Sequence, residues 1–207
     1  MSAFDTVTLP DPVPTGESSL EHILATRRSD RSFAMTPLTL QQVGQLLWAC
    51  QGVTSEDGKR TAPSAFGLFS LSIYVAPRIV TSLDQGLYRY IPAQHQLEGV
   101  GSDKDMYRFI AEVLVEGSTY DSAADFLLTG SLPPLKEKKG DFALPELCLE
   151  AGHAAQNVLL QATSLGLASV PIGAIHAEQA KEFIAEGLDA VYAVQVGHPA
   201  GISSDRP

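Results

Sequence analysis

Residues 149–167, LEAGHAAQNVLLQATSLGL, decide the fold of this chain, and residues 170–174, VPIGA, follow them closely. No Asp, Glu, Lys or Arg occurs in residues 151–177, which is typical of a buried element. Small and apolar residues predict a long helix over 145–165, ended by a glycine, and then a strand over 170–175. Glutamine, asparagine and histidine interrupt the apolar run, which favours a protein core over a membrane span.

On both sides of this segment the pattern alternates between helices and strands. Capping patterns at Ser18–Glu21 and Thr39–Gln42 predict two helix starts, and these helices end near Arg27 and at Gly52. Apolar and β-branched residues predict strands at 68–76, 126–129 and 191–196, a hairpin of 86–91 with 96–100, and helices at 103–115 and through Ala180 and Phe183. Helices between strands, with a hairpin, predict an α+β layered domain.

The length of 207 residues suits a single domain with a real core. Residues 1–17 contain three prolines and no helical period, so they predict an extended arm. The domain is then expected over 18–207.

Charge and cysteine usage exclude several functions. The formal net charge is −10, whereas nucleic acid and anionic lipid reward a basic surface. We therefore expect no nucleic-acid partner and no membrane partner. Cys50 and Cys148 are the only cysteines, they form no CxxC pattern, and no signal peptide precedes the domain, so a cytoplasmic protein with two reduced thiols is expected.

The familiar catalytic motifs are missing from the chain. It contains no GxGxxG before a helix, no GxxxxGK[ST], no HExxH and no GxSxG. The five histidines are scattered, so we expect no metal site. An organic cofactor is then expected to carry the chemistry, while the protein binds and orients it, and no side chain is assigned as catalytic.

The first positive signal is RRSDRS at Arg27–Ser32, where three of the 14 basic residues fall within five positions of an acidic chain. A guanidinium donates paired, charge-assisted hydrogen bonds to phosphate oxygens, and nearby hydroxyls add neutral donors. The alternative is a solvated helix end, where cations complement the helix dipole. Two further stretches, TAPSAFGL at 61–68 and VPIGA at 170–174, combine small residues with glycine and could bring backbone close to a planar ligand, but each is also an ordinary loop or strand exit.

Taken together, four ordered blocks resemble the nitroreductase superfamily. They are RRSDRSF with PLTL (27–40), LLWACQGVT (46–54), RTAPSA (60–65) and the 149–174 segment. The likeness runs from about Ser19 to Pro199 and is closest to the branch of dehydrogenases that oxidise azoline rings in modified peptides. It implies a nitroreductase-like layered fold with a central, mostly antiparallel sheet flanked by helices.

The resemblance also implies the cofactor FMN and the residues that bind it. The basic string would hold the FMN phosphate and the pyrimidine edge through Arg27, Arg28, Ser29 and Arg31, with Arg31 supporting the reduced flavin electrostatically. The loop that reaches the flavin from the partner subunit would contribute Pro63, Ser64, Ala65 and Gly67. Backbone along the flavin ring would come from Pro171, Ile172, Gly173 and Ala174. His198 stands where the family places a basic residue near the phosphate.

The activity implied is hydride transfer from NAD(P)H to a small acceptor, a quinone or nitroaromatic, by a ping-pong mechanism in a homodimer with FMN at its interface. Two alternatives remain: a substrate-specific dehydrogenase, such as an azoline oxidase, and a flavin-binding module without turnover. Phe66, where the branch usually has Gly, and the absence of its aromatic and basic motif around 142–145 set this chain apart.

The sequence also predicts where a histidine, a tryptophan, three lysines and two apolar helix faces lie in the structure. His153 is expected to be a hydrogen-bonded core histidine, and Trp48 a core or dimer contact. Lys136, Lys138 and Lys139 are expected in a solvated loop. Because the helices at 39–50 and 145–165 are apolar over wide arcs, part of their surface is expected to meet a second copy.

Overall fold

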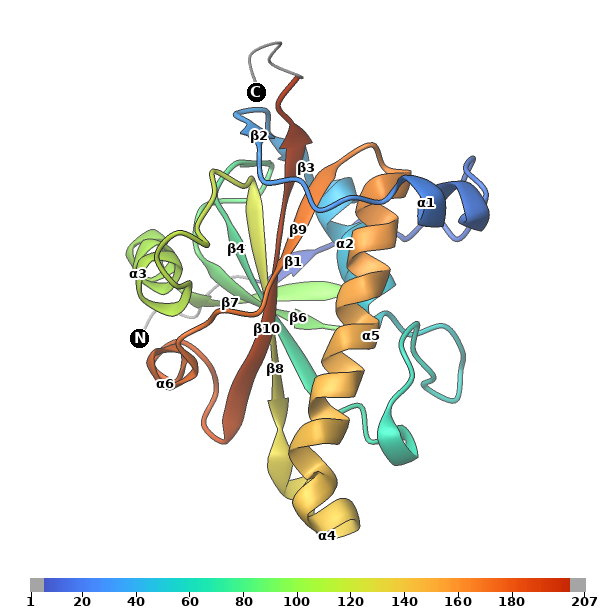
Figure 1. Ribbon diagram of the computed structural model, residues 1–207, viewed down its shortest axis with the longest axis vertical. Helices are drawn as coiled ribbons and strands as arrows, with labels where there is room; N and C mark the ends of the chain where they lie inside the picture. The colour runs from blue at the N-terminus through green and yellow to red at the C-terminus, as the bar shows by residue number, and fades with distance from the viewer. Residues whose placement is uncertain (1–5, 202–207) are drawn as a thin grey trace.

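The computed structural model describes residues 6–201 of the chain and shows a twisted sheet between two helical layers (Figure 1). The main sheet has the strand order β1-β7-β6-β4-β8-β10-β2, and β9 pairs with β10 beside it. The strands are β1 Thr6–Thr8, β2 Phe33–Ala34, β3 Leu38–Thr39, β4 Leu71–Pro77, β5 Val80–Thr81, β6 Leu87–Ile91, β7 Gln96–Gly101, β8 Ala124–Ser131, β9 Ala168–Ile172 and β10 Leu188–Pro199. The helices are α1 Leu20–Thr26, α2 Leu40–Gln51, α3 Asp103–Val113, α4 Leu132–Lys139, α5 Ala143–Ser164 and α6 Ala177–Ala180, with short 3₁₀ turns η1 Ala65–Gly67 and η2 Gly140–Phe142.

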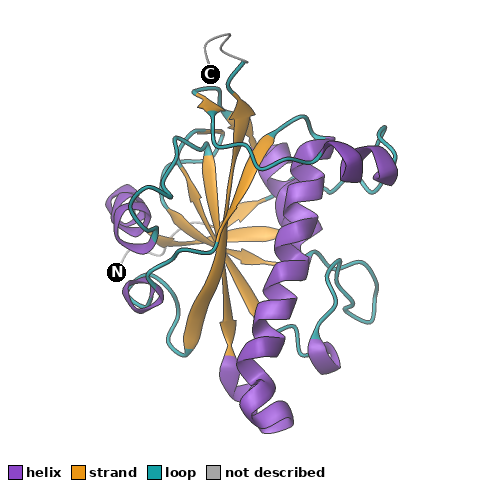
Figure 2. Ribbon diagram, viewed as in Figure 1, coloured by secondary structure: helices purple, strands orange, loops and turns teal. Residues whose placement is uncertain are grey.

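The sheet is antiparallel at every described pairing, and the short β3–β5 pair outside it is parallel. Figure 2 shows the strands fanning through the centre of the molecule, with helices on either side. This confirms the expected α+β layered fold with a central, mostly antiparallel sheet.

Alternation along β4 divides the core into two halves. Ile73 and Val75 face the layer of α2 and α5, whereas Tyr74 and Ala76 face the layer of α3 and α6. Successive side chains of a strand point to opposite faces of the sheet. In a sheet covered on both faces, consecutive residues of a strand are therefore all apolar. Five of the seven β4 side chains are therefore buried in an unbroken run, Ile73–Pro77.

The capping patterns begin the helices where the sequence predicts. Thr39 caps α2, its hydroxyl accepting from Gln42 N while Gln42 returns a bond to Thr39 N. Ser19 caps α1 by accepting from His22 N. Gly52 ends α2 and Arg27 ends α1, as expected.

The long helix α5 packs tightly against the sheet at one glycine. A Cβ on Gly130 of β8 would come within 2.2 Å of Leu147 Cδ1, so only glycine lets the helix approach this closely. Its opposite side is exposed, however: residues such as Cys148, Leu149, Gly152 and His153 face outward. Helix α5 is therefore buried on its sheet side only, and its exposed stripe is available for the contact that we expect with a second copy.

Other expected boundaries also need correction. Lys136, Lys138 and Lys139 lie on helix α4 rather than in a loop, because the prolines after Leu132 start a helix instead of preventing one. The expected helix through Ala180 and Phe183 is a single turn that ends at Ala180. Strand β8 is twice the expected length, eight residues instead of four.

The expected N-terminal arm is held along the domain. Strand β1 pairs with Gln96–Glu98 of β7, and Gln45 bonds both the N–H and the C=O of Val13. Residues 1–5 of the arm and 202–207 of the expected domain lie outside the described residues. Within residues 6–201, no helix combines the length and apolarity needed to cross a membrane.

Candidate functional site

The basic string follows directly on α1 and runs beside the start of β9. Asp30 N donates to the Ser169 carbonyl at 3.0 Å, so the string is pinned to the outer edge of this strand. Asp30 also accepts from Ser32 N at 2.9 Å, which shapes the turn. The side chains of Arg28, Ser29 and Arg31 are left exposed.

The end of β10 reaches the same place. His198 pairs with Ala34 in the register of β10 and β2, and Ala200 N donates to the Ser32 carbonyl at 3.0 Å. Residues that lie some 170 positions apart in the chain are thereby joined. The structure thus brings together Arg27–Ser32, the start of β9 and His198, as the expected phosphate site requires.

The three arginines of this string have no acidic partner. Within residues 6–201, none of Arg27, Arg28 and Arg31 forms an ion pair with a carboxylate, whereas Arg78, Arg89 and Arg108 do. Arg28 donates to the carbonyls of Ala25 and Arg27. Unpaired guanidinium groups gathered in an acidic protein leave donors and positive charge available to an external anion.

The far end of β9 presents its backbone. Strand β9 pairs with β10 along one edge. The backbone carbonyl of Ser169 points to the other edge, where it accepts from Asp30 N. Alternate residues of a strand share an edge, so the backbone carbonyl of Pro171 points the same way as that of Ser169. Gly173 and Ala174 follow the strand and are exposed, and the Ala174 carbonyl accepts from Val115 N at 3.3 Å. The expected flavin-ring segment thus begins on the edge of β9 that faces away from β10 and continues into the exposed residues after the strand.

The loop Pro63–Gly67 lies elsewhere in the subunit. Ser64 donates to Glu150 Oε2 at 2.7 Å and accepts from Phe69 N at 2.8 Å, which fixes the loop against the first half of α5. Phe66 adopts φ 56°, a left-handed conformation that is strained for an aromatic residue, and its ring is 66% exposed. Lys139 Nζ lies 5.2 Å from the centre of that ring and also pairs with Glu146 at 2.8 Å.

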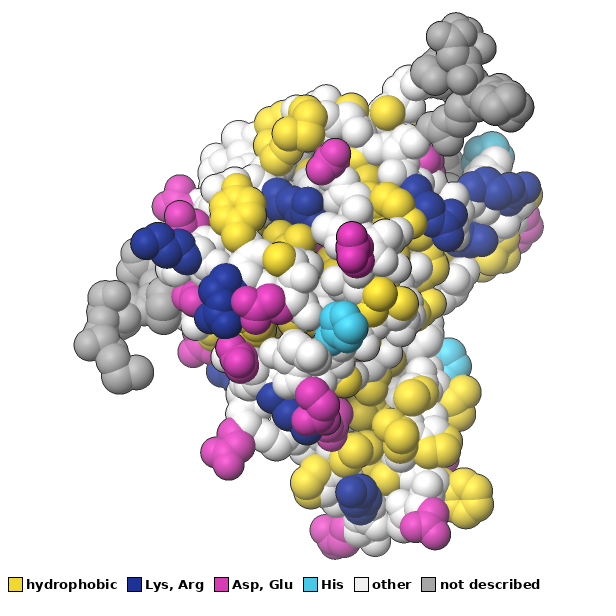
Figure 3. All heavy atoms as spheres, turned by 60° about the vertical axis from the view of Figure 1, so that its left-hand side comes forward, with side chains coloured by type: hydrophobic (Ala, Val, Ile, Leu, Met, Phe, Trp, Pro, Cys, Tyr) yellow, Lys and Arg dark blue, Asp and Glu magenta, His cyan; other side chains and the backbone are white. Residues whose placement is uncertain are grey.

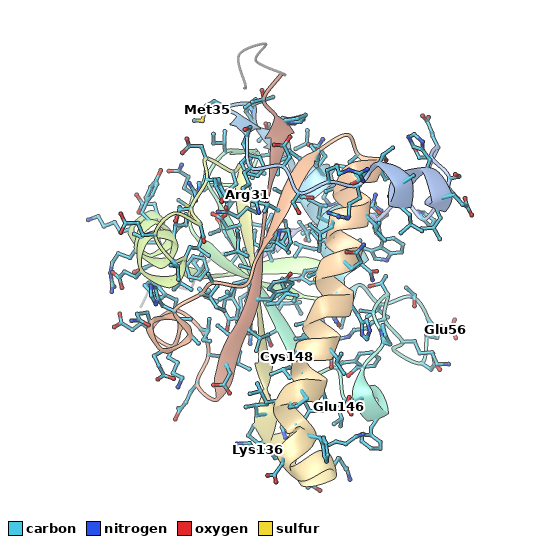
Figure 4. All side chains as sticks on the ribbon, viewed as in Figure 1. Arg31, Met35, Glu56, Lys136, Glu146 and Cys148 are labelled. Carbon is cyan, nitrogen blue, oxygen red and sulfur yellow. The ribbon has the colours of Figure 1, made fainter. Side chains whose placement is uncertain are left out.

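One subunit alone does not bring this loop to the basic string. Glu150, the anchor of the loop, precedes the end of α5 by 14 residues, which is roughly 20 Å along a helix. Figure 4 shows Arg31 in the upper half of the molecule, beside the sheet, and Glu146 and Lys136 in the lower half, near the start of α5. The two halves of the expected site therefore stand at opposite ends of one long helix.

Glu150 is a buried acid that the sequence did not single out. The pKa of Glu150 is raised, mainly by burial. Hydrogen bonds from Ser64 and from the backbone of Leu71 and Ser70, together with the positive charge of Arg60, oppose this shift without reversing it. Arg60 in turn donates to Gln51 and lies 4.7 Å from the ring centre of Phe69. Glu150 and Arg60 form the polar base of the loop, and the 86-residue separation of Ser64 from Glu150 hid this link from sequence reasoning.

Two further expectations meet different outcomes. His153 is exposed on α5, so the expectation of a core histidine is wrong: helical periodicity places it on the outer arc, away from the sheet. Trp48 is half-buried and lines a cavity of about 630 Å³ between the arm, α1, α2 and the last turns of α5. Within the described residues no group of three or more His, Cys, Asp or Glu could hold a metal.

Comparison with known proteins identifies the family of this chain. The model of the nitroreductase family matches residues 24–202. The chain belongs to the nitroreductase family. A Methanocaldococcus jannaschii protein described as a nitroreductase is 33% identical over 168 residues, which cover 81% of this chain and 85% of that protein. Like its family, the chain is an oxidoreductase.

Solved structures agree with this nitroreductase assignment. The structure described as a nitroreductase of Ralstonia eutropha superposes with a TM-score of 0.80 at 29% identity, covering 95% of this chain and 90% of that one. The Escherichia coli microcin synthetase McbBCD complex, with truncated pro-MccB17 bound, contains a chain that superposes with a TM-score of 0.71 at 16% identity, covering 92% and 76%. The second likeness shows a shared fold.

Proposed function

We propose that this nitroreductase-family protein is an FMN-dependent oxidoreductase that transfers hydride from NAD(P)H to a small quinone or nitroaromatic acceptor. We further propose that it works in the cytoplasm as a homodimer with FMN at the subunit interface. The single observation that carries the proposal is the cluster of Arg27, Arg28 and Arg31, which pairs with no carboxylate of residues 6–201 and is joined to the outer edge of β9.

The donor set fits the FMN phosphate. Guanidinium groups of Arg27, Arg28 and Arg31 and the hydroxyl of Ser29 would bind its oxygens and the pyrimidine edge of the flavin. His198 is anchored beside this string and would add a donor.

The outer edge of β9 fits the flavin ring. The Gly173 N–H would donate to the ring, and the lack of side chains at Gly173 lets backbone approach it closely. Bound FMN would supply the hydride chemistry, which agrees with the absence of a nucleophile motif. Arg31 would stabilise negative charge on the reduced ring, and the acceptor would occupy the ring face left by the nicotinamide.

Unpartnered apolar surface supports the homodimer. Helix α1 has no buried residue, and its Leu20 and Leu24 are 58% and 54% exposed. A short helix depends on packing for its stability, and a second copy would cover the apolar face of α1 that its own subunit leaves exposed. The same subunit leaves Pro63–Gly67 and the basic string at opposite ends of α5, and a two-fold partner would bring each loop to the other subunit's string.

The test is cofactor content and anaerobic reduction of the purified protein. We expect a yellow protein with about one FMN per subunit, whose flavin absorbance bleaches when NADH or NADPH is added and returns when menadione follows. Bleaching without turnover of any quinone or nitroaromatic favours a dedicated dehydrogenase. Protein that neither retains nor binds added FMN contradicts the proposal.

A further inference from the structure

The outer stripe of α5 is a neutral strip on a strongly acidic molecule. Pro145, Cys148, Gly152 and Gln156 follow one another at helical spacing and are all exposed. No charged residue interrupts the strip, although the chain carries a net charge of −10. Two identical acidic molecules repel least where neither presents charge, so this strip is where two copies can approach.

Gly152 is the residue of this strip that allows the closest approach of a second helix. A Cβ built on Gly152 meets no atom within 4 Å, so open space lies above it. Small residues allow two helices to cross at short range. A two-fold axis through an antiparallel α5 pair at Gly152 would set each residue opposite the one equally far on the other side of 152.

The two ends of α5 differ in shape in a way that suits this symmetry. Phe142, at the start of the helix, is 70% exposed, the highest exposure of any aromatic residue in the described part of the chain. Asn157, Leu160, Gln161 and Ser164, on the last turns of α5, line the cavity of about 630 Å³, together with Trp48, Leu20 and Ile23. A two-fold rotation about an axis at Gly152 sets position 142 at the level of the partner's position 162, beside those last turns.

We propose that the α5 helices of two copies cross antiparallel at Gly152, and that Phe142 of each subunit inserts into the cavity beside Trp48 of the other. This rests on the homodimer of the proposed function and deepens it, because it names the residue and the recess that set the register. An aromatic side chain fits a recess with a tryptophan and aliphatic walls, and such anchors dominate interface energies.

The start of α5 lies at an apolar end of the molecule. Figure 3 shows apolar side chains gathered over the lower end of the molecule, where Figure 1 places α4 and the start of α5. The antiparallel register sets this apolar end against the partner's cavity.

The shared site follows from the same register. Phe66, on the loop proposed to reach the partner's flavin, lies at the α4–α5 junction through its contact with Lys139. That junction is the end of the subunit that the two-fold axis would place against the partner's α1 and basic string. Seating Phe142 in the cavity would therefore also carry the loop Pro63–Gly67 toward the partner's FMN.

Disulfide crosslinking tests the register. Position 156 lies one turn beyond Gly152 and Cys148 one turn before it, so the pair should meet across the interface. We expect Gln156→Cys, with native Cys148, to form a covalent dimer under mild copper-phenanthroline oxidation. Wild type and Lys104→Cys, whose new thiol lies on the far helix α3, should stay uncrosslinked. Crosslinking of wild type through Cys148 alone, or none in Gln156→Cys, would overturn the register.

Dimer affinity tests the recess. Phe142→Ser should raise the dimer dissociation constant at least about a hundredfold, because each dimer loses two anchors of roughly tenfold or more. Tyr107→Ser removes an aromatic side chain that is 52% exposed on α3 and should leave the constant unchanged. Equal constants for Phe142→Ser and wild type would overturn the insertion. Sedimentation of the wild type separates the two proposals: a monomer contradicts the homodimer itself, whereas a dimer insensitive to Phe142 contradicts only this seating.

Discussion

At the residue scale, the arginines of this protein fall into two sets, according to whether or not they contact a carboxylate. Arg78, Arg89 and Arg108 each contact a carboxylate, whereas Arg27, Arg28 and Arg31 contact none in the described residues. The distinction was accessible from sequence only as clustering, because pairing depends on residues far along the chain. The structure adds the neighbours, β9 and the end of β10, that turn a basic string into one wall of a site.

If the unpaired arginines bind the cofactor, substituting them should lower the affinity for FMN. Arg27→Ala and Arg31→Ala should each weaken FMN binding by roughly 1.5–3 kcal/mol, the usual value for a charged hydrogen bond. Arg89→Ala, which breaks a half-exposed pair with Glu98, should leave FMN binding unchanged. Fluorescence titration of apoprotein with FMN measures these constants. Wild-type affinity in both string variants would remove the string from the cofactor site.

A second residue-scale prediction concerns His95, which fastens the arm. Its Nε2 lies 3.0 Å from the Pro10 carbonyl and its Nδ1 lies 2.9 Å from the Tyr90 hydroxyl. Burial lowers the pKa of His95, and the Pro10 carbonyl and Asp11 oppose that shift. The folded state thus favours neutral His95, so its stabilisation is complete above the unfolded pKa of about 6.5 and is lost as pH falls through the lower folded value.

The measurement is the free energy of unfolding in urea at pH 7.5 and pH 5.5. Wild type should lose more stability between these values than His95→Gln, which cannot titrate there. The difference in free energy of unfolding between wild type and His95→Gln should therefore be smaller at pH 5.5 than at pH 7.5. Parallel pH dependence of the two proteins would show that His95 stays protonated or stays neutral in both states.

At the scale of elements, sequence periodicity located helices and strands better than it located their faces. Capping residues such as Thr39 act within one turn, so the starts of α1 and α2 could be read locally. The buried face of α5 is decided by contacts such as Leu147 against Gly130, which no local pattern contains. For this reason His153 was assigned to the core although it is exposed. The loop Pro63–Gly67 was found by resemblance, but its anchor, Glu150, was not.

Helix α5 carries the element-scale prediction. In an isolated subunit, replacing an open helical glycine with a larger residue improves helix propensity by up to about 1 kcal/mol. At a close helix crossing the same change pushes the partner away, and overpacking costs about 1–3 kcal/mol. Gly152→Leu should therefore raise the dimer dissociation constant roughly tenfold or more, as measured by sedimentation equilibrium. Ala111→Leu, an equivalent enlargement on the exposed side of α3, is the control. Tighter association of Gly152→Leu would exclude a crossing at this position.

At the scale of the whole molecule, the two parts of the proposed cofactor site lie far apart in the described subunit, on opposite sides of the length of α5. The basic string and β9 edge would bind FMN, and the loop Pro63–Gly67 would complete the site of another subunit. Catalysis and dimerisation should therefore fail together.

Subunit complementation tests this shared site most directly. A chain with Arg27→Ala and Arg31→Ala lacks its FMN wall but keeps its loop, whereas a Ser64→Asp chain keeps the wall but sets a carboxylate beside Glu150, where like charges displace the loop. Each homodimer should show little NAD(P)H-dependent menadione reduction. After the two proteins are mixed and their subunits exchanged, the heterodimer should recover about one working site of the wild-type two. Activity that stays at the level of the two separate variants, or a fully active 22 kDa monomer of the wild type, would contradict a site shared between subunits.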